Sequence, residues 1–357
     1  MAFVLYGVSI LFGLIFPKNK WITVFILFTM FILAAFKTTD ADMENYLHGY
    51  YAASDEGRYV GFTLFVQLIS QFQFDFEEYL CIFYFITFSI LFIGIRKLTE
   101  NVNFILASYL ISCYALDVVQ MKSALADSIV LLAFAYYFGD NDGLDKKRAG
   151  ISVCVLFLAM FIHFSAAFYF LAFILYLFLR GKQYYQVYLL LIAIIIAILS
   201  LGNGFSSMLG IGSGLGMLGN DNEYLTGWME QRTRLGFLIP FLEVFLIVAP
   251  YWLIKNKNII KERKNNFLAI KLFMCTLILA LPLLYFNINY TRLFRIYLIL
   301  SAVMMSDYGL RSKYKLREFN TLVLFFVSLF YAFFIDTYQS WDTTLGALLN
   351  ANSILSL

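Results

Sequence analysis

The sequence has 357 residues, of which 62% are hydrophobic and only 14% are charged. Soluble domains carry about 25% charged residues, so this composition excludes an ordinary soluble protein and indicates an all-α protein with many membrane spans. The net charge of +3 is small and no nucleic-acid-binding motif accompanies it, so nucleic acid is not an expected partner.

Hydrophobic runs recur from one end of the chain to the other and predict twelve transmembrane helices in one integral membrane domain covering residues 1–357. The first run has no Lys or Arg, unlike the basic start of a signal peptide, so we expect an uncleaved span. The apolar stretch 149–180 is too long for one span, and we divide it at His163. The expected spans are 2–16, 21–36, 79–95, 104–117, 124–139, 149–161, 166–180, 187–201, 237–254, 267–286, 293–308 and 320–335.

Residues 59–74 are apolar but end in Gln71, Gln73 and Asp75, which predicts an interfacial or re-entrant helix rather than a span. With the N-terminus outside, the inner loops then hold 19 of the 26 Lys and Arg residues, as the positive-inside rule requires. Both termini are then expected outside. The seven basic residues left at the outer face are Lys37, Arg58, Lys122, Arg232, Arg234, Arg292 and Arg295.

Two long outer segments follow from this topology. Segment 37–78 is rich in carboxylates and tyrosines and carries the amphipathic stretch, so we expect it to form one wall of an active site. Segment 202–236 is glycine-rich and then polar, which is typical of a mobile loop or lid.

Four of the inward-running spans begin at the outer face beside basic or polar residues. A helix N-terminus offers free N–H groups and a partial positive charge, so these ends together predict a phosphate or diphosphate site. The groups concerned are Lys122 with Ser123, His163 with Ser165, Arg232 with Arg234, and Arg292 with Arg295.

Each of these groups also has a structural interpretation. The arginines near 292 would then bind lipid headgroups, and those near 232 would be solvated loop residues. Lys122 would form an ion pair with Asp117 or Asp127, and His163 would be a packed, hydrogen-bonded histidine. An ionisable residue among apolar helices is costly, which favours a functional role for His163.

Asp40 and Asp42 form a D-x-D pair in the first outer segment. Such a pair can hold a divalent cation that binds a diphosphate, but a hard metal needs several more oxygen ligands. Because the basic residues already supply positive charge for a diphosphate, we expect no metal and no other cofactor. A divalent metal at Asp40 and Asp42 is the minority alternative.

Four segments resemble the EpsG-like, Wzy-type polysaccharide polymerases, in the same order, over residues 37–300. The first-loop segment reads Asp42-x-x-Asn45-Tyr46-x-x-x-Tyr50 and then Glu56-Gly57-Arg58-Tyr59. The segments Met121-Lys122-Ser123-Ala124-Leu125-Ala126, Ile162-His163-Phe164-Ser165-Ala166 and Tyr290-Thr291-Arg292-Leu293-Phe294-Arg295-x-Tyr297 follow. Lys122 stands where the family usually has Arg, so the charge is kept but the bidentate fork is lost.

The resemblance implies a GT-C-like glycosyltransferase of the bacterial inner membrane with an outward-facing active site. It would transfer a glycan from undecaprenyl diphosphate to a sugar hydroxyl of a lipid-linked repeat unit, making O-antigen, capsule or exopolysaccharide. Implied partners are undecaprenyl-diphosphate-linked oligosaccharides, membrane lipids, a flippase and a chain-length regulator.

The same resemblance assigns roles to the candidate residues. The diphosphate would bind Lys122, Arg232, Arg234, Arg292 and Arg295. The base that accepts the hydroxyl proton would be His163, Asp42 or Glu56. Sugars would contact Asp40, Tyr46, Tyr50, Tyr59 and Tyr297.

Two other functions stay open at this point. A glycan ligase would use the same lipid donor. A lipid-linked oligosaccharide flippase or transporter would place its polar groups nearer the bilayer midplane and often show inverted repeats, of which the sequence has none.

Overall fold

The structure is a computed structural model, and it describes residues 1–52, 59–138, 146–179, 293–309, 317–338 and 340–355, with short pieces at 242, 245–246, 272 and 274–279. Within these ranges the chain is helical, and its only β-type pairing is an isolated bridge between Lys37 and Asn352. The described part therefore confirms an all-α fold.

The helices of the first half are α1 (Ala2–Ile15), α2 (Lys20–Ala35), α3 (Met43–Tyr51), α4 (Val60–Ser70), α5 (Phe76–Leu98), α6 (Val102–Ser112), α7 (Tyr114–Val119) and α8 (Met121–Phe138). Those of the second half are α9 (Lys146–Ile162), α10 (Ser165–Leu179), α16 (Arg295–Gly309), α17 (Arg317–Ala332), the π-helix η3 (Phe333–Tyr338), the 3₁₀-helix η4 (Trp341–Thr343) and α18 (Leu345–Asn350).

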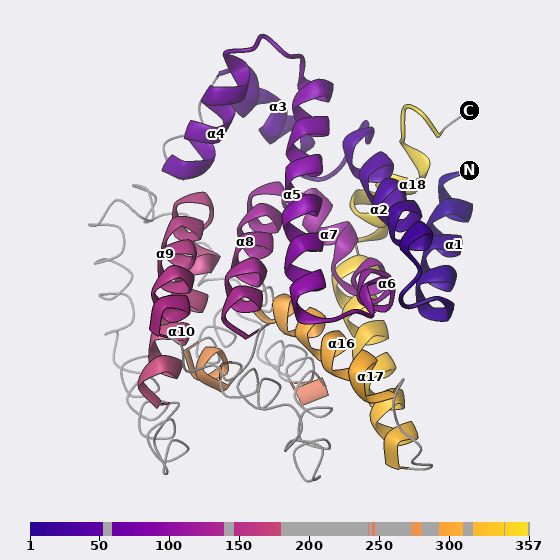
Figure 1. The fold of residues 1–357 in the computed structure, drawn as a ribbon. Coiled ribbons are helices and arrows are strands. Elements are labelled where there is room, and N and C mark those ends of the chain that lie inside the picture. Colours follow the sequence, from indigo (N-terminus) through magenta and orange to yellow (C-terminus); the bar gives the residue numbers. More distant parts are fainter. Residues whose placement is uncertain are drawn as a thin grey trace, which may run out of the picture.

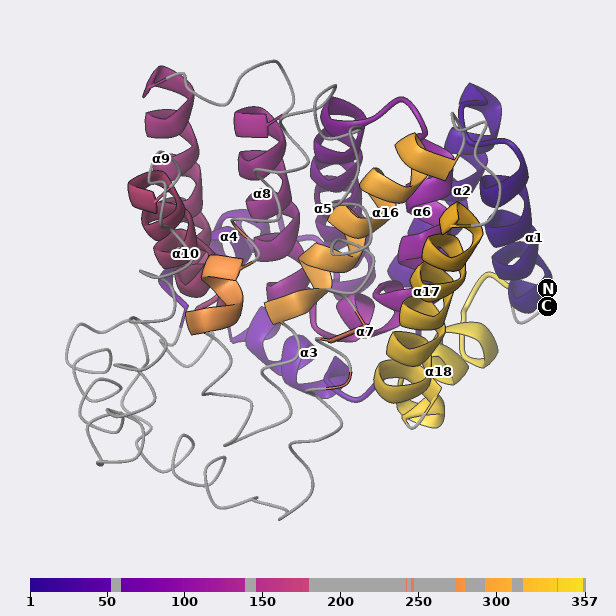
Figure 2. The same cartoon turned by 90° about the horizontal axis from the view of Figure 1, so that it is seen from below.

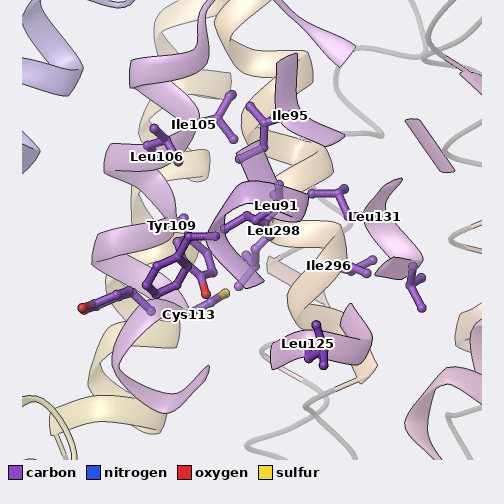
Figure 3. Packing of buried hydrophobic residues seen from close by; sticks show 14 of the residues in the cluster. Leu91, Ile95, Ile105, Leu106, Tyr109, Cys113, Leu125, Leu131, Ile296 and Leu298 are labelled. Carbon is purple, nitrogen blue, oxygen red and sulfur yellow. The ribbon is translucent and has the colours of Figure 1, made fainter. Parts of the chain in front are cut away.

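The long helices stand side by side. From α1 the row runs through α2, α6, α5 and α8 to α9 and α10, and each member packs against its neighbours (Figure 1). Seen from below, α16 crosses this row diagonally and packs against α6 and α17 (Figure 2). Apolar side chains from α5, α6, α8 and α16 meet in the interior, among them Leu91, Leu106, Leu131 and Leu298 (Figure 3).

Helix α5 illustrates how the sequence specifies these elements. Asp75 and Glu78 form a capping box at its start, acidic residues occupy its first turn, and Arg96 and Lys97 occupy its last turn. This arrangement complements the helix dipole at both ends. Its 23 residues span about 34 Å, enough to cross the roughly 30 Å hydrocarbon core of a bilayer.

Among the described residues, two helices are long and apolar enough to cross a membrane, Phe76–Leu98 and Met121–Phe138. Shorter apolar helices occur at α1, α2, α4, α6, α10, α16 and α17. The predicted break at His163 is confirmed, because α9 ends at Ile162 and α10 begins at Ser165. The predicted spans 187–201, 237–254 and 267–286 lie wholly or mostly outside the described residues, so the total of twelve stays a prediction.

The prediction of one helix over 104–117 is wrong. That stretch divides at Cys113 into α6 and the six-residue α7, and the chain breaks again at Gln120 before α8. Ser108 and Ser112 each donate a 2.8 Å hydrogen bond to the carbonyl four residues earlier. Such bonds compete with the backbone ladder and bend helices.

Helices α3 and α4 lie above the upper ends of the helices in the row, and both chain termini lie toward the same upper side of the molecule (Figure 1). Several basic residues lie at helix ends away from α3 and α4. Lys97 and Arg148 each lie 5.9 Å from the ring of Tyr136, and Lys18 pairs with Glu100 at 2.7 Å. The ends of α1, α5 and α8 and the start of α9 thus share one basic end of the molecule, opposite α3 and α4 in Figure 1.

The C-terminal segment 340–355 binds the connection between α2 and α3. The Thr38 amide donates to the Ala351 carbonyl (2.8 Å), and the Ser353 amide donates to the Phe36 carbonyl (2.9 Å). Farther along, the Ala41 amide donates to the Thr343 carbonyl (3.3 Å). This connection is therefore held by backbone bonds to the last described residues.

Candidate active site

Two helix breaks meet at the end of the molecule that carries α3 and α4. The first is Gln120, between α7 and α8, and the second is His163–Phe164, between α9 and α10. Ser123, in the first turn of α8, lies 3.3 Å from Nε2 of His163. The N-termini of α8 and α10 are therefore close together, as an anion site built from helix ends requires.

The ammonium of Lys122 is surrounded by three aromatic rings, which we call the Lys122 ring cluster. Its Nζ lies 5.6 Å from the ring centre of Tyr46, 5.3 Å from that of Tyr59 and 5.2 Å from that of Phe62. Each contact at this range contributes about 0.5–2 kcal/mol, depending on exposure. The rings come from α3, from the residue before α4, and from α4, so they fix the ammonium between these helices and α8.

His163 is held beside this cluster. Its ring stacks on Tyr59 with centres 5.1 Å apart and an interplanar angle of 22°. The Ser165 amide donates to Nδ1 at 3.2 Å, and the Ser165 hydroxyl lies 2.7 Å from the same atom. Because Nδ1 accepts a backbone hydrogen bond, the neutral ring carries its proton on Nε2. The Ser123 hydroxyl lies 3.3 Å from Nε2 and 3.5 Å from Nδ1.

The approach of α4 to α9 depends on a glycine. A Cβ at Gly61 would lie 2.9 Å from backbone atoms of Phe161. The absence of a side chain therefore lets α4 begin directly on the end of α9. This close approach is what sets Tyr59 on His163.

Arg295 occupies a different environment from Lys122. Its side chain is 3% exposed and pairs with Asp117 at 2.9 Å. Both terminal nitrogens lie 3.3 Å from Oε1 of Gln120, and Tyr109 donates to the other Asp117 oxygen at 2.9 Å. Asp117, one of the two carboxylates that the structural interpretation of Lys122 considered, is therefore paired with Arg295.

Lys37 and Asp40 form a second buried ion pair, and neither side chain is exposed. The Lys37 ammonium also donates to the Val118 carbonyl in α7 (2.8 Å). Burial lowers the pKa of Lys37 from its ordinary value, and the carboxylates of Asp40 and Asp42 oppose that shift. Asp40 is thus committed to a structural pair, whereas Asp42 is partly exposed at the start of α3, one turn before Tyr46.

The structure places the tyrosines expected to bind sugar in two different environments. Tyr46 and Tyr59 belong to the Lys122 ring cluster. Tyr50 is buried, donates to the Phe74 carbonyl (2.8 Å) and stacks on Tyr79. Tyr297 is also fully buried and hydrogen-bonds to Thr276. In the structure, Tyr50 and Tyr297 thus contact the protein core, and their contact with sugar stays a prediction.

Several predicted site residues lie outside the described residues. They are Glu56 and Arg58 of the first outer segment, Arg232 and Arg234 of segment 202–236, and Arg292. Across the described ranges, no group of three or more His, Cys, Asp or Glu side chains could hold a metal ion.

Three residues that the sequence analysis did not select take part in the site or its support. Phe62 contacts Lys122, while Gln120 and Tyr109 surround the Arg295–Asp117 pair. Phe62 had a usable signal, because it follows Tyr59 by three residues and thus shares a helix face with it. Gln120 had none, since its partner Arg295 is far away in the sequence. Tyr109 is only eight residues from Asp117, but the two lie on opposite sides of the break at Cys113, which was not predicted.

Comparison with known proteins gives one relationship. The sequence model of the EpsG family matches residues 20–345, nearly the whole chain. Searches of curated proteins and of solved structures find no match to the chain. The matched range contains both helix breaks, the Lys122 ring cluster and the Arg295–Asp117 pair.

Proposed function

Because this chain belongs to the EpsG family of polymerase-like membrane proteins, we propose that it is a Wzy-type polysaccharide polymerase. It transfers a glycan from undecaprenyl diphosphate to a sugar hydroxyl of a lipid-linked repeat unit, at the outer face of the bacterial inner membrane. The observation that carries the proposal is the meeting of Lys122 and His163 at two helix N-termini, beneath the aromatic cover of α3 and α4.

The reaction requires positive charge near the leaving group. The acceptor oxygen bonds to the anomeric carbon, the bond from that carbon to the diphosphate breaks, and the diphosphate leaves with the electron pair. Negative charge therefore grows on the phosphate oxygens. The Lys122 ammonium, the His163 Nε2–H group and the partial positive charge at two helix N-termini stabilise that charge. Arg232, Arg234 and Arg292 are proposed to add to it from outside the described residues.

The reaction also needs a base that removes the proton from the acceptor hydroxyl, and a carboxylate suits this role. The Nδ1 atom of His163 already accepts a backbone hydrogen bond, so the ring is arranged as a donor rather than as a base. Asp42 is partly exposed and lies one helical turn from Tyr46, which contacts Lys122. We assign Asp42 as the general base, with Glu56 as the alternative, and Tyr46 and Tyr59 as sugar contacts.

The distribution of basic residues supports the orientation. Lys18, Lys97 and Arg148 belong to the end opposite α3 and α4, and basic residues favour the cytoplasmic side of a membrane. The candidate site then faces outward, where lipid-linked repeat units are polymerised.

The test uses purified protein in liposomes with the lipid-linked repeat units that accumulate in a deletion strain. We expect a ladder of polymer in excess chelator, because the proposed site uses basic residues rather than a metal. Lys122→Met should slow polymer formation by about 10²–10³-fold, the effect of losing one charge-stabilising donor. Lys20→Met, at the α1–α2 connection, is the matched control and should retain wild-type activity.

Three results would contradict parts of this proposal. Repeat units that accumulate on the inner leaflet of the deletion strain would indicate a flippase. Transfer of finished polymer to another acceptor, without growth of the ladder, would indicate a ligase. Activity that disappears in chelator and returns with magnesium or manganese would assign the diphosphate to a metal.

A further inference from the structure

We infer that Arg295 is a positioning residue: its guanidinium fixes the break between α7 and α8 and thereby holds Lys122 among its three rings. This inference rests on the proposed function, in which Lys122 contacts the diphosphate. It assigns to one of the arginine positions a role that requires no contact with substrate.

The contacts of Arg295 span the break. Its Nη1 atom donates to Asp117 in α7 (2.9 Å), and Nη1 and Nη2 both donate to Gln120, the residue at the break itself (3.3 Å each). Tyr109 of α6 holds the second oxygen of Asp117. A planar guanidinium can bind two neighbouring acceptors at once, whereas an ammonium cannot do so in this fixed geometry.

Helix α7 is also fixed from its other side. The Val118 carbonyl accepts hydrogen bonds from Lys37 (2.8 Å) and from Tyr84 of α5 (2.6 Å). Helix α7 has only six residues and is broken from both neighbouring helices, so these bonds supply the support that a longer helix gives itself. Lys122 follows Gln120 by two residues, and any movement of the break moves its ammonium.

The charge of Arg295 is already satisfied inside the protein. Its side chain is 3% exposed, that of Asp117 is 7% exposed, and Asp127 of α8 lies within electrostatic range of both. A phosphate that displaced Asp117 would leave a carboxylate buried without its partner, which is strongly unfavourable. Lys122, in contrast, lies among three aromatic rings, which attract a cation without a fixed hydrogen-bond geometry.

The test is a double-mutant cycle on the ion pair. Arg295→Gln and Asp117→Asn should each lower polymer formation by about 10²-fold, because a displacement of about 1 Å in a catalytic group has that effect. The double variant pairs two neutral amides and should return to within a factor of about three of wild type. A double variant as inactive as Arg295→Gln would overturn the inference.

Gln120→Leu provides a variant in which the buried ion pair is intact. It removes the link to the break while the charge of Arg295 stays in place. We expect a loss of polymer of about tenfold or more, again from misplacement. Wild-type polymer from Gln120→Leu would show that the link has no positioning role.

A measurement independent of activity separates this inference from the proposed function. The rate at which acetic anhydride acetylates Lys122, read by mass spectrometry, reports whether its ammonium stays among the rings. We expect the rate to rise several-fold in both single variants and in Gln120→Leu, and to return to the wild-type rate in the double variant. Unchanged acetylation in all variants would overturn the positioning role even if the wild type polymerises repeat units. A wild type that makes no polymer would overturn the proposed function alone.

Discussion

Lys122 shows how aromatic rings can hold a cation beside a membrane. The sequence left two interpretations open for Lys122, a diphosphate contact or an ion pair with Asp117 or Asp127, since both carboxylates are close in the sequence. The structure instead gives Asp117 to Arg295 and surrounds Lys122 with Tyr46, Tyr59 and Phe62. A ring face attracts a cation through its electrostatic field rather than through a directed hydrogen bond, so the rings hold the ammonium without fixing the direction of its N–H groups.

His163 allows a direct test of donor against base. His163→Phe keeps an aromatic ring to stack on Tyr59 but removes the Nε2–H donor, and we expect polymer formation to fall by about 10²–10³-fold. His163→Arg restores a charged donor and should retain measurable activity. Rates measured with saturating lipid donor give both values.

His48 serves as the matched control, because it is the other histidine of the chain and is exposed on α3. His48→Phe should polymerise at the wild-type rate. If His163→Phe did the same, His163 would be a packing residue, and the helix ends with Lys122 would bind the diphosphate alone.

The sequence identified the chemical groups better than their partners. Lys122, His163, Tyr46 and Tyr59 were selected from residue type and position, and the structure brings these four together. Asp40 and Arg295 were selected by the same reasoning, yet both are buried in ion pairs. Local sequence shows that a charged residue exists near a helix end, but the residue that neutralises it can come from anywhere in the chain.

At the scale of the elements, the contact between α4 and α9 carries the geometry of the site. A Cβ at Gly61 would lie 2.9 Å from backbone atoms of Phe161, and backbone cannot move aside as a flexible side chain can. Gly61→Ala should therefore push α4 from α9, at a cost of about 1–3 kcal/mol, and separate Tyr59 from His163. We expect reduced polymer formation with the protein still present in the membrane.

Gly150→Ala in α9 is the control, because a Cβ there meets nothing within 4 Å. Alanine favours a helix over glycine, so this variant should be as stable as the wild type or slightly more so. Polymer from Gly61→Ala at the level of Gly150→Ala would contradict the role given to the close approach.

Helix limits were predictable where apolar runs end in polar residues, and less so inside an apolar run. The division at His163 follows from a polar residue that interrupts the run, and it is confirmed. The break at Cys113 lies within the hydrophobic run 104–117 and has no Gly or Pro. It is instead accompanied by serine side chains bonded to the backbone and by tertiary bonds to α7, which a hydrophobicity pattern does not contain.

At the scale of the whole molecule, the basic end and the acidic, aromatic end predict a membrane topology that can be tested. In a variant without native cysteines, Glu44→Cys on α3 should react with a membrane-impermeant maleimide added to intact cells. Lys147→Cys, exposed at the start of α9, should react only after permeabilisation. The opposite labelling pattern would place the candidate site in the cytoplasm and rule out the proposed reaction.

The backbone bonds between the α2–α3 connection and the C-terminal segment have a consequence for the order of synthesis. Thr38 and its partner Ala351 are 313 residues apart. At about 5–20 residues per second, the ribosome makes the second partner roughly 15–60 s after the first. The connection that carries Lys37 and Asp40 thus receives this support only after those 313 residues have been made. A truncated chain would insert its first helices normally and still lack these bonds.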